Sequence, residues 1–181
     1  MGGLRTIRKR ISDERVRMSL FRVLEENVLC SISTVAPRNR AHVNTAYFCY
    51  SPDLELYFLS DPNSLHCRNV ASNPSMAVTV FSSSQEWGEP DRGIQLFGTC
   101  RPARARRAKE AERLYARRFP RYSKWMAGKS KDDKLRASQL RSYRFYRFVP
   151  RAVKILDERV FGGGVFVLVP LTVDATPKTH G

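Results

Sequence analysis

The amino-acid sequence predicts a mainly β fold with helices, a small antiparallel barrel carrying its helices on the outside. Apolar and polar residues alternate with a period of two over most of residues 28–169. Short polar turns, such as Pro37-Arg38-Asn39-Arg40, join the first strands, which favours a meander over alternating strands and helices. About seven strands are expected, and an antiparallel set of that size normally closes to remove its edges.

Two long helices are predicted beside these strands. Residues 11–27 begin with Ser12 as a possible N-cap and then place apolar residues at helical spacing, which gives a helix with one buried face. Residues 103–119 form a second, arginine-rich helix that Pro120 ends. The stretch that follows mixes aromatic anchors with a polar, lysine-rich run around 128–134, which we expect to be mobile.

A strand pattern is present at residues 28–36, 41–50, 54–60, 76–81 and 93–101, returns at 142–150 and 152–157, and is present again at 165–169. In the third of these stretches, Leu54, Leu56 and Phe58 alternate with Glu55 and Tyr57, so this strand should have two unlike faces. Gly98 interrupts the strand at 93–101, which predicts a bulge or a close backbone approach.

A strand, a tight turn and a short helix follow one another between Leu54 and Ser75. Asp61-Pro62-Asn63 forms the turn, Ser64 is placed to cap a helix, and Pro74 stops it. Free backbone N–H groups and the positive end of the helix dipole suit an anion, usually a phosphate. An ordinary connection without a ligand is the alternative.

The length of 181 residues fits one domain with appendages. We expect a basic N-terminal arm at 1–10, one domain over 11–170, and a flexible C-terminal tail at 171–181. The domain includes a basic helical excursion at about 103–141. No apolar run reaches the length of a membrane span, and the N-terminus lacks the apolar core of a secretory signal.

The net charge is +15, and it is concentrated in one segment. Residues 101–151 hold 18 Lys and Arg against four Asp and Glu, a net +14. Clustered arginines interleaved with Tyr115, Tyr122, Trp125 and Tyr143 would allow phosphate contacts and stacking on a nucleic acid. The opposing interpretation, which we favour, is that the arginines solvate helix faces.

The four cysteines lie far apart and form no CxxC pair. With three histidines in the chain, a structural zinc site is disfavoured, and no metal site is predicted. Unbridged thiols indicate a reduced protein, and we expect a cytoplasmic location.

The order of these segments resembles the pyridoxamine 5′-phosphate oxidase-like family over roughly residues 20–165. The resemblance is carried by ISTVAPRNRAHVNTAYFCY, LYFLSDPNSLHCRNVASNPSMAVTV, GIQLFG and the helix end RRFP. The block of strand, SDPNS, helix and Asn-Pro is the most specific part. The C-terminal Trp and Arg of the true oxidases are not evident, because Trp87 and Trp125 both lie earlier.

The resemblance implies an FMN-binding split β-barrel, a homodimer with FMN in a groove at the interface, and an oxidoreductase acting on an unidentified small molecule. The cofactor-binding positions that it implies are Asn44, Thr45, Ala46 and Tyr47 beside the ring and ribityl chain, Leu59, Ser60, Ser64, Leu65 and His66 near the phosphate, and Gln95 against the isoalloxazine ring. It assigns no catalytic residue.

The sequence departs from the family where the phosphate would bind. Leu65 stands where Arg is expected, and His66 stands where Lys is expected. A phosphate prefers fixed cations with several donors, and leucine supplies none. This departure keeps other interpretations open, namely a deazaflavin or heme ligand, or a ligand-free dimeric barrel.

Overall fold

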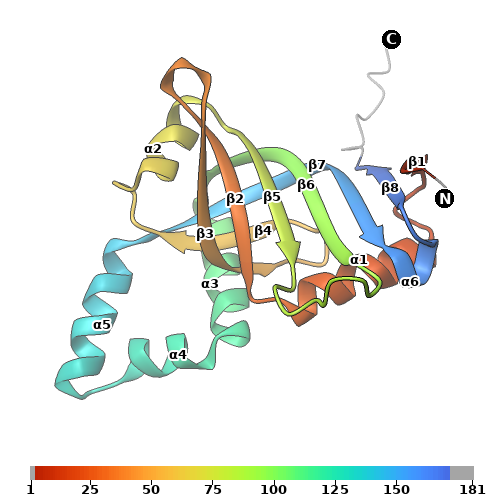
Figure 1. Cartoon of the computed structure of the whole chain (residues 1–181). Coiled ribbons are helices and arrows are strands. Elements are labelled where there is room, and N and C mark those ends of the chain that lie inside the picture. Colours follow the sequence, from red (N-terminus) through yellow and green to blue (C-terminus); the bar gives the residue numbers. More distant parts are fainter. Residues whose placement is uncertain (1–2, 172–181) are drawn as a thin grey trace, which may run out of the picture.

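Eight strands form one hydrogen-bonded sheet in the order β1-β8-β7-β4-β3-β2-β5-β6, as seen in a computed structural model that describes residues 3–171 (Figure 1). The strands are β1 (Arg5–Arg8), β2 (Leu29–Ala36), β3 (Arg40–Tyr50), β4 (Leu56–Ser60), β5 (Ser75–Phe81), β6 (Arg92–Pro102), β7 (Arg144–Asp157) and β8 (Val165–Pro170). The helices are α1 (Glu14–Glu26), α2 (Leu65–Ser72), α3 (Arg106–Arg118), α4 (Pro120–Ala127), α5 (Lys131–Ser142) and α6 (Glu158–Phe161), with a 3-10 turn at Pro37–Asn39.

Six of the strands close into a ring, because β7 pairs with both β4 and β6. All pairings within the ring are antiparallel, as predicted. The length of β7 allows it to change partner, since residues 144–148 pair with β4 and residues 152–156 pair with β8. Outside the ring, β8 pairs in parallel with β1, a strand that the sequence analysis left unassigned within the N-terminal arm.

The hydrophobic core fills the ring and continues under α1. Val16, Leu20, Val23 and Leu24 of α1 belong to the same buried cluster as Ile32, Phe48 and Ile155 of the strands. Figure 1 shows α1 across the lower ends of β2, β5 and β6 and α2 near their upper ends. The two helices therefore cover opposite ends of the ring.

Several local predictions are corrected by the structure. Helix α1 is capped by Asp13 rather than Ser12, because Asp13 Oδ1 accepts a hydrogen bond from Val16 N at 3.3 Å. The two strands expected at 142–150 and 152–157 are the single strand β7. The run at 128–134, expected to be mobile, includes the start of α5, where Ser130 Oγ accepts from Asp133 N.

Strand β4 is also shorter and more enclosed than predicted. Leu54 has a φ of +64° and lies in the turn before the strand. The prediction of two unlike faces is wrong, because Leu56 and Tyr57 on opposite faces are both buried. Tyr57 packs in a second buried cluster with Ala111 and Leu114 of α3, which therefore covers this part of the outer sheet surface.

The bulge predicted at Gly98 is confirmed, since the register between β6 and β7 shifts between Phe97 and Gly98. Of the predicted C-terminal tail, residues 172–181 lie outside the described residues. The described residue Leu171 donates its N–H to the oxygen of Arg151 and packs against the core. None of the helices within residues 3–171 combines the length and the apolar character that a bilayer crossing requires.

Candidate functional site

A row of polar side chains crosses the outer face of the sheet over five strands. Residues paired directly across neighbouring strands share a face. Thr45 pairs with Ser31, Ser31 with Thr79, Thr79 with Gln95, and Gln95 with Lys154. Each of these residues is exposed or half-buried. The row thus offers hydroxyls, an amide and an ammonium group along one line of the surface.

Exposed apolar side chains border this polar row. They are Leu29, Val43, Tyr47, Phe81 and Phe97, and between 44% and 64% of each residue is exposed. Each lies two positions along β2, β3, β5 or β6 from a member of the polar row, and this spacing places it on the same outer face. A surface of this composition suits a flat, partly apolar partner.

The polar row ends in a groove of about 310 Å³ beside β7. Gln95, Thr79 and Lys154 line it together with Phe81 and Phe166. The Lys154 ammonium lies 4.0 Å from the centre of the Phe166 ring, which fixes this cation above an aromatic face.

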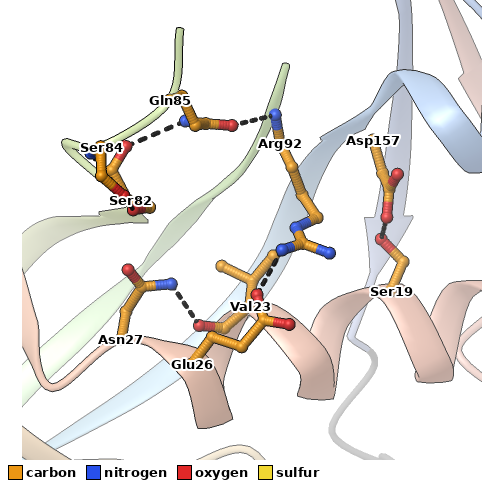
Figure 2. A network of polar contacts seen from close by, with 9 residues as sticks. All are labelled: Ser19, Val23, Glu26, Asn27, Ser82, Ser84, Gln85, Arg92 and Asp157. Atoms are coloured by element: carbon orange, nitrogen blue, oxygen red, sulfur yellow. Dashed lines mark hydrogen bonds and ion pairs between the residues drawn. The ribbon is translucent and has the colours of Figure 1, made fainter. Parts of the chain in front are cut away.

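A loop anchored to α1 forms one wall of that groove. Gln85 Oε1 accepts from Arg92 N at 2.6 Å, and its amide nitrogen donates to the oxygen of Ser82 at 3.0 Å. Figure 2 shows this loop and the Arg92 guanidinium reaching Glu26 on α1. In the same view Ser19 Oγ donates to the buried carboxylate of Asp157 at 2.7 Å, which ties α1 to β7. The groove wall is therefore anchored to the rest of the fold.

The structure divides the predicted residues of β3 between two faces. Thr45 and Tyr47 lie on the outer face, as Gln95 does. Asn44 pairs with the buried Ile32 and Ala46 with the buried Cys30, so both lie on the inner face. A continuous stretch of a strand cannot face one ligand, because its side chains alternate. Sequence reasoning missed Ser31, Thr79 and Lys154, although their alternation with apolar neighbours was visible.

Three of the predicted phosphate-end residues, Ser60, Ser64 and His66, form a separate cluster at the start of α2. His66 is buried, and its Nε2 lies 2.7 Å from Ser60 Oγ and 3.1 Å from Ser64 Oγ. Ser64 is the N-cap residue of α2, as predicted, but its Oγ donates to the oxygen of Asp61 at 2.7 Å and makes no capping hydrogen bond to the helix. The His42 ring stacks beside His66 with centroids 6.4 Å apart.

The environment of His66 favours the neutral form of its imidazole. Burial, and then the neighbouring His42, lower the pKa of His66 below its ordinary value of 6.5. A neutral ring whose Nε2 already contacts two hydroxyls is not a cation for a phosphate. Leu65 is 42% exposed and has no polar atom on its side chain. Leu59 is half-buried on β4. These residues therefore do not fit the phosphate of FMN.

Tyr115, Tyr122 and Trp125 of the basic segment already contact other side chains of the fold. Tyr115 packs against Phe119, Tyr122 and Phe145 with centroids 4.5 to 5.5 Å apart. The Arg136 guanidinium lies over the Trp125 ring. The structure therefore gives no support to base stacking by these rings, and the charge of the segment is its remaining feature. In residues 3–171, no group of three His, Cys, Asp or Glu is placed to hold a metal.

The profile of the pyridoxamine 5′-phosphate oxidase family matches residues 19–156. The chain therefore belongs to this family, as the resemblance indicated. No functionally curated protein matches the sequence.

Three solved structures illustrate the range of proteins that share the fold. A Clostridium acetobutylicum protein related to general stress protein 26, of the pyridoxinephosphate oxidase family, aligns with a TM-score of 0.60 at 9% identity, covering 88% of this chain and 96% of its own. The heme storage protein HutZ of Vibrio cholerae aligns with a TM-score of 0.56 at 16% identity, covering 78% of this chain and 91% of its own. A heme-binding protein of Mycobacterium smegmatis aligns with a TM-score of 0.63 at 10% identity, covering 84% of this chain and 57% of its own. At these identities the likeness concerns the fold alone.

Proposed function

We propose that this protein is a flavin-binding homodimer of the split β-barrel type and that it holds the flavin by its ring. The polar row from Thr45 to Lys154, bordered by exposed apolar side chains, carries this proposal. An isoalloxazine ring presents apolar faces and a polar edge, and hydroxyl and amide groups on a flat surface complement that pattern. The groove at Gln95 would receive the polar edge.

A second copy of the chain is the proposed partner on this face. Five exposed apolar side chains on four adjoining strands form a patch of the kind that marks an interface. A ligand on the flat face would be enclosed when two such faces come together, which the shallow surface of one copy cannot achieve. Dimerisation and ligand binding are thus one proposal.

The chemistry proposed for the bound state is oxidoreduction of a small molecule. A bound flavin supplies hydride chemistry, while the protein binds and orients the ring. We assign no catalytic residue, because the side chains of the row are three hydroxyls, one amide and one ammonium group, without a carboxylate or a histidine among them.

The alternatives differ in how well they use this face. A deazaflavin presents a tricyclic ring of the same shape and would occupy the same row. Heme is less well supported, because His42 and His66, the histidines within residues 3–171, both lie on the inner side. The four buried thiols, all free, support the further proposal of a reducing, cytoplasmic setting.

The test compares two flavins that differ in the phosphate alone. Protein freed of ligand is titrated with FMN and with riboflavin, and binding is followed by flavin absorbance and fluorescence. Binding through the ring predicts dissociation constants for FMN and riboflavin that agree within about threefold, because no fixed cation binds the phosphate of FMN. Binding of neither flavin would contradict the proposal, and a sharp Soret band with hemin would redirect it to heme.

Substitution Leu65→Arg provides a matched variant. Leu65 is exposed, so an arginine there is accommodated, and it should tighten FMN binding about tenfold while leaving riboflavin unchanged. His66→Lys is not a suitable companion, because it would bury an ammonium group beside Ser60 and Ser64. No change in the affinity for FMN would show that the phosphate end lies elsewhere.

A further inference from the structure

Exposed basic side chains form a stripe along α3. They follow one another at intervals of three or four residues, and all four are exposed: Arg106, Lys109, Arg113 and Arg117. Residues at this spacing lie on one face of a helix. At a rise of about 1.5 Å per residue, this α3 stripe is about 16 Å long. Ala111 and Leu114, on another side of the helix, are buried against the sheet.

The acidic side chains of α3 contact other residues. Glu110 Oε2 pairs with Arg107 Nη1 at 2.8 Å, and Glu112 Oε1 accepts from the hydroxyl of Tyr122 at 3.5 Å. Within residues 3–171, none of the four side chains of the α3 stripe forms an ion pair. The fold therefore leaves the positive charge of the stripe without a neutralising partner.

Charges of one sign along this helix oppose its own stability. Lys109 and Arg113 lie four residues apart, as do Arg113 and Arg117, and like charges at this spacing repel each other. Arg106 lies in the first turn, which has no acidic residue, although the positive end of the helix dipole favours one there. A surface that serves solubility alone mixes both signs. The α3 stripe is therefore better suited to an anionic partner than to solvent.

A groove of about 520 Å³ lies beside the stripe, and a buried ionic network fixes one of its cations. Arg107 Nη2 lies 3.6 Å from Oε1 of Glu55, which is 7% exposed and also pairs with Arg147. The groove holds four cations and two carboxylates, of which the Glu110 carboxylate is paired with Arg107. Its lining residues are Asp53, Arg106, Arg107, Lys109, Glu110 and Arg113.

The composition of this surface fits a polyanion better than a protein or a lipid surface. The exposed residues of α3 are all charged, namely the stripe and Glu112. A protein interface contains an apolar core, and a helix that binds a lipid surface inserts apolar side chains. The apolar residues of α3 are packed against Cys49 and Tyr57 instead. A phosphate backbone requires cations alone.

The packing of the nearby aromatic rings favours a duplex over a single strand. Proteins that bind single strands stack the bases on exposed rings. Tyr115 and Tyr122 instead pack on each other and on Phe145, and Trp125 lies under the Arg136 guanidinium. Attraction to the backbone of a duplex depends on the number and position of the cations, and it needs no side chain held in one orientation.

We propose that the α3 stripe binds the phosphate backbone of a double-stranded nucleic acid without sequence preference. Its four cations contact phosphate groups, and no contact reads the bases. Figure 1 shows α3, α4 and α5 projecting from the ring, away from β1 and β8. The proposal is independent of flavin binding, because the stripe shares no residue with the polar row or with the groove at Gln95.

Fluorescence anisotropy of a labelled DNA duplex, titrated with the full chain, tests the proposal. The logarithm of the association constant should fall against the logarithm of the salt concentration with a slope of about −4, since each phosphate contact contributes about −0.9. A second duplex of unrelated sequence should bind within about threefold of the first. Failure to bind either duplex, or a clear preference for one of them, would overturn the proposal.

A variant without the charges of the α3 stripe tests where the duplex binds. It carries Arg106→Gln, Lys109→Gln, Arg113→Gln and Arg117→Gln. This variant should bind the duplex at least about tenfold more weakly and lose about three units of the salt slope, while its urea midpoint should not fall. The matched control removes the same net charge from exposed positions of the N-terminal arm and α1, by Arg5→Gln, Arg8→Gln, Arg10→Gln and Arg22→Gln.

The control variant should bind the duplex within about threefold of the unmodified chain. Equal losses in the two variants would assign the binding to net charge and overturn the proposal. Binding to phosphatidylserine vesicles without binding to the duplex would assign the stripe to a membrane surface, and a single strand that binds as tightly as the duplex would exclude the duplex; either result overturns the proposal. None of these measurements uses a flavin, so failure here and failure of the flavin proposal are separate results.

Discussion

Gly98 determines how closely β6 and β7 approach each other. A Cβ built at this position would lie 2.1 Å from the oxygen of Val149 and 2.8 Å from Pro150 Cα. Both are backbone atoms, so no side chain can move aside to make room. The glycine is required here by the close approach of two strands at the bulge.

Substitution Gly98→Ala should destabilise the protein by about 3 kcal/mol, because the added methyl group forces the two strands apart. Urea denaturation followed by circular dichroism measures the change. Gly163→Ala is the control, since the nearest atom to a Cβ there is Glu158 Oε1 at 3.9 Å. Equal stabilities of the two variants would contradict this account of the bulge.

His66 makes stability depend on pH. Its pKa is lowered in the folded state by burial and by His42, so the unfolded chain binds a proton more readily. The neutral ring's contribution is therefore fully present above the ordinary pKa of 6.5 and is lost as the pH falls toward the lower, folded pKa. The urea midpoint should fall more between pH 7 and 5 in the unmodified chain than in His66→Gln. Parallel profiles would refute this role.

At the scale of elements, one arginine joins α3 to the end of α1. Arg118 Nη2 donates to the oxygens of Leu24 and Asn27 at 2.6 and 2.5 Å. Its guanidinium also lies over the rings of Phe48 and Tyr50, 4.9 and 5.1 Å from their centres. A cation at a helix C-terminus satisfies carbonyl groups that have no partner within the helix.

Replacement of Arg118 by alanine should lower the free energy of unfolding by about 2 kcal/mol, since it removes two charge-assisted hydrogen bonds and the contact with two rings. The neighbouring Arg117 is exposed, and Arg117→Ala should change the free energy of unfolding by less than about 0.5 kcal/mol. Thermal and urea unfolding of both variants measure the difference. Equal losses of stability in the two variants would show that the net charge, and not these contacts, causes the effect.

At the scale of the whole molecule, the proposed dimer depends on the outer face of β2, β3, β5 and β6. Val43→Asp places a charge on this face, where desolvation in an interface would be costly. We expect this variant to sediment as a monomer and to lose flavin binding. Leu135→Asp is the control, because Leu135 is also exposed but lies on α5, outside this face, and this variant should remain dimeric. A monomeric unmodified chain would exclude the dimer.

The sequence by itself determined the positions of the ring strands and of α1, α2 and α3, the bulge at Gly98 and the membership of the family. These features depend on local signals, namely period-two alternation, a glycine within a strand and the order of short motifs. Only the tertiary structure decided which side of the fold each candidate residue faces. Asn44 and Thr45 are neighbours in the sequence, yet pairing with Ile32 and Ser31 places them on opposite faces.

The same reason explains why the sequence could not place the phosphate-end residues and the polar row. The sequence showed that Leu65 and His66 depart from the family, but the inward turn of His66 toward Ser60 depends on how α2 packs on the ring. The row from Thr45 to Lys154 draws on five strands, and its members come together only through the register of strand pairs. Register is set by the closure of the whole sheet, which no short stretch of sequence determines.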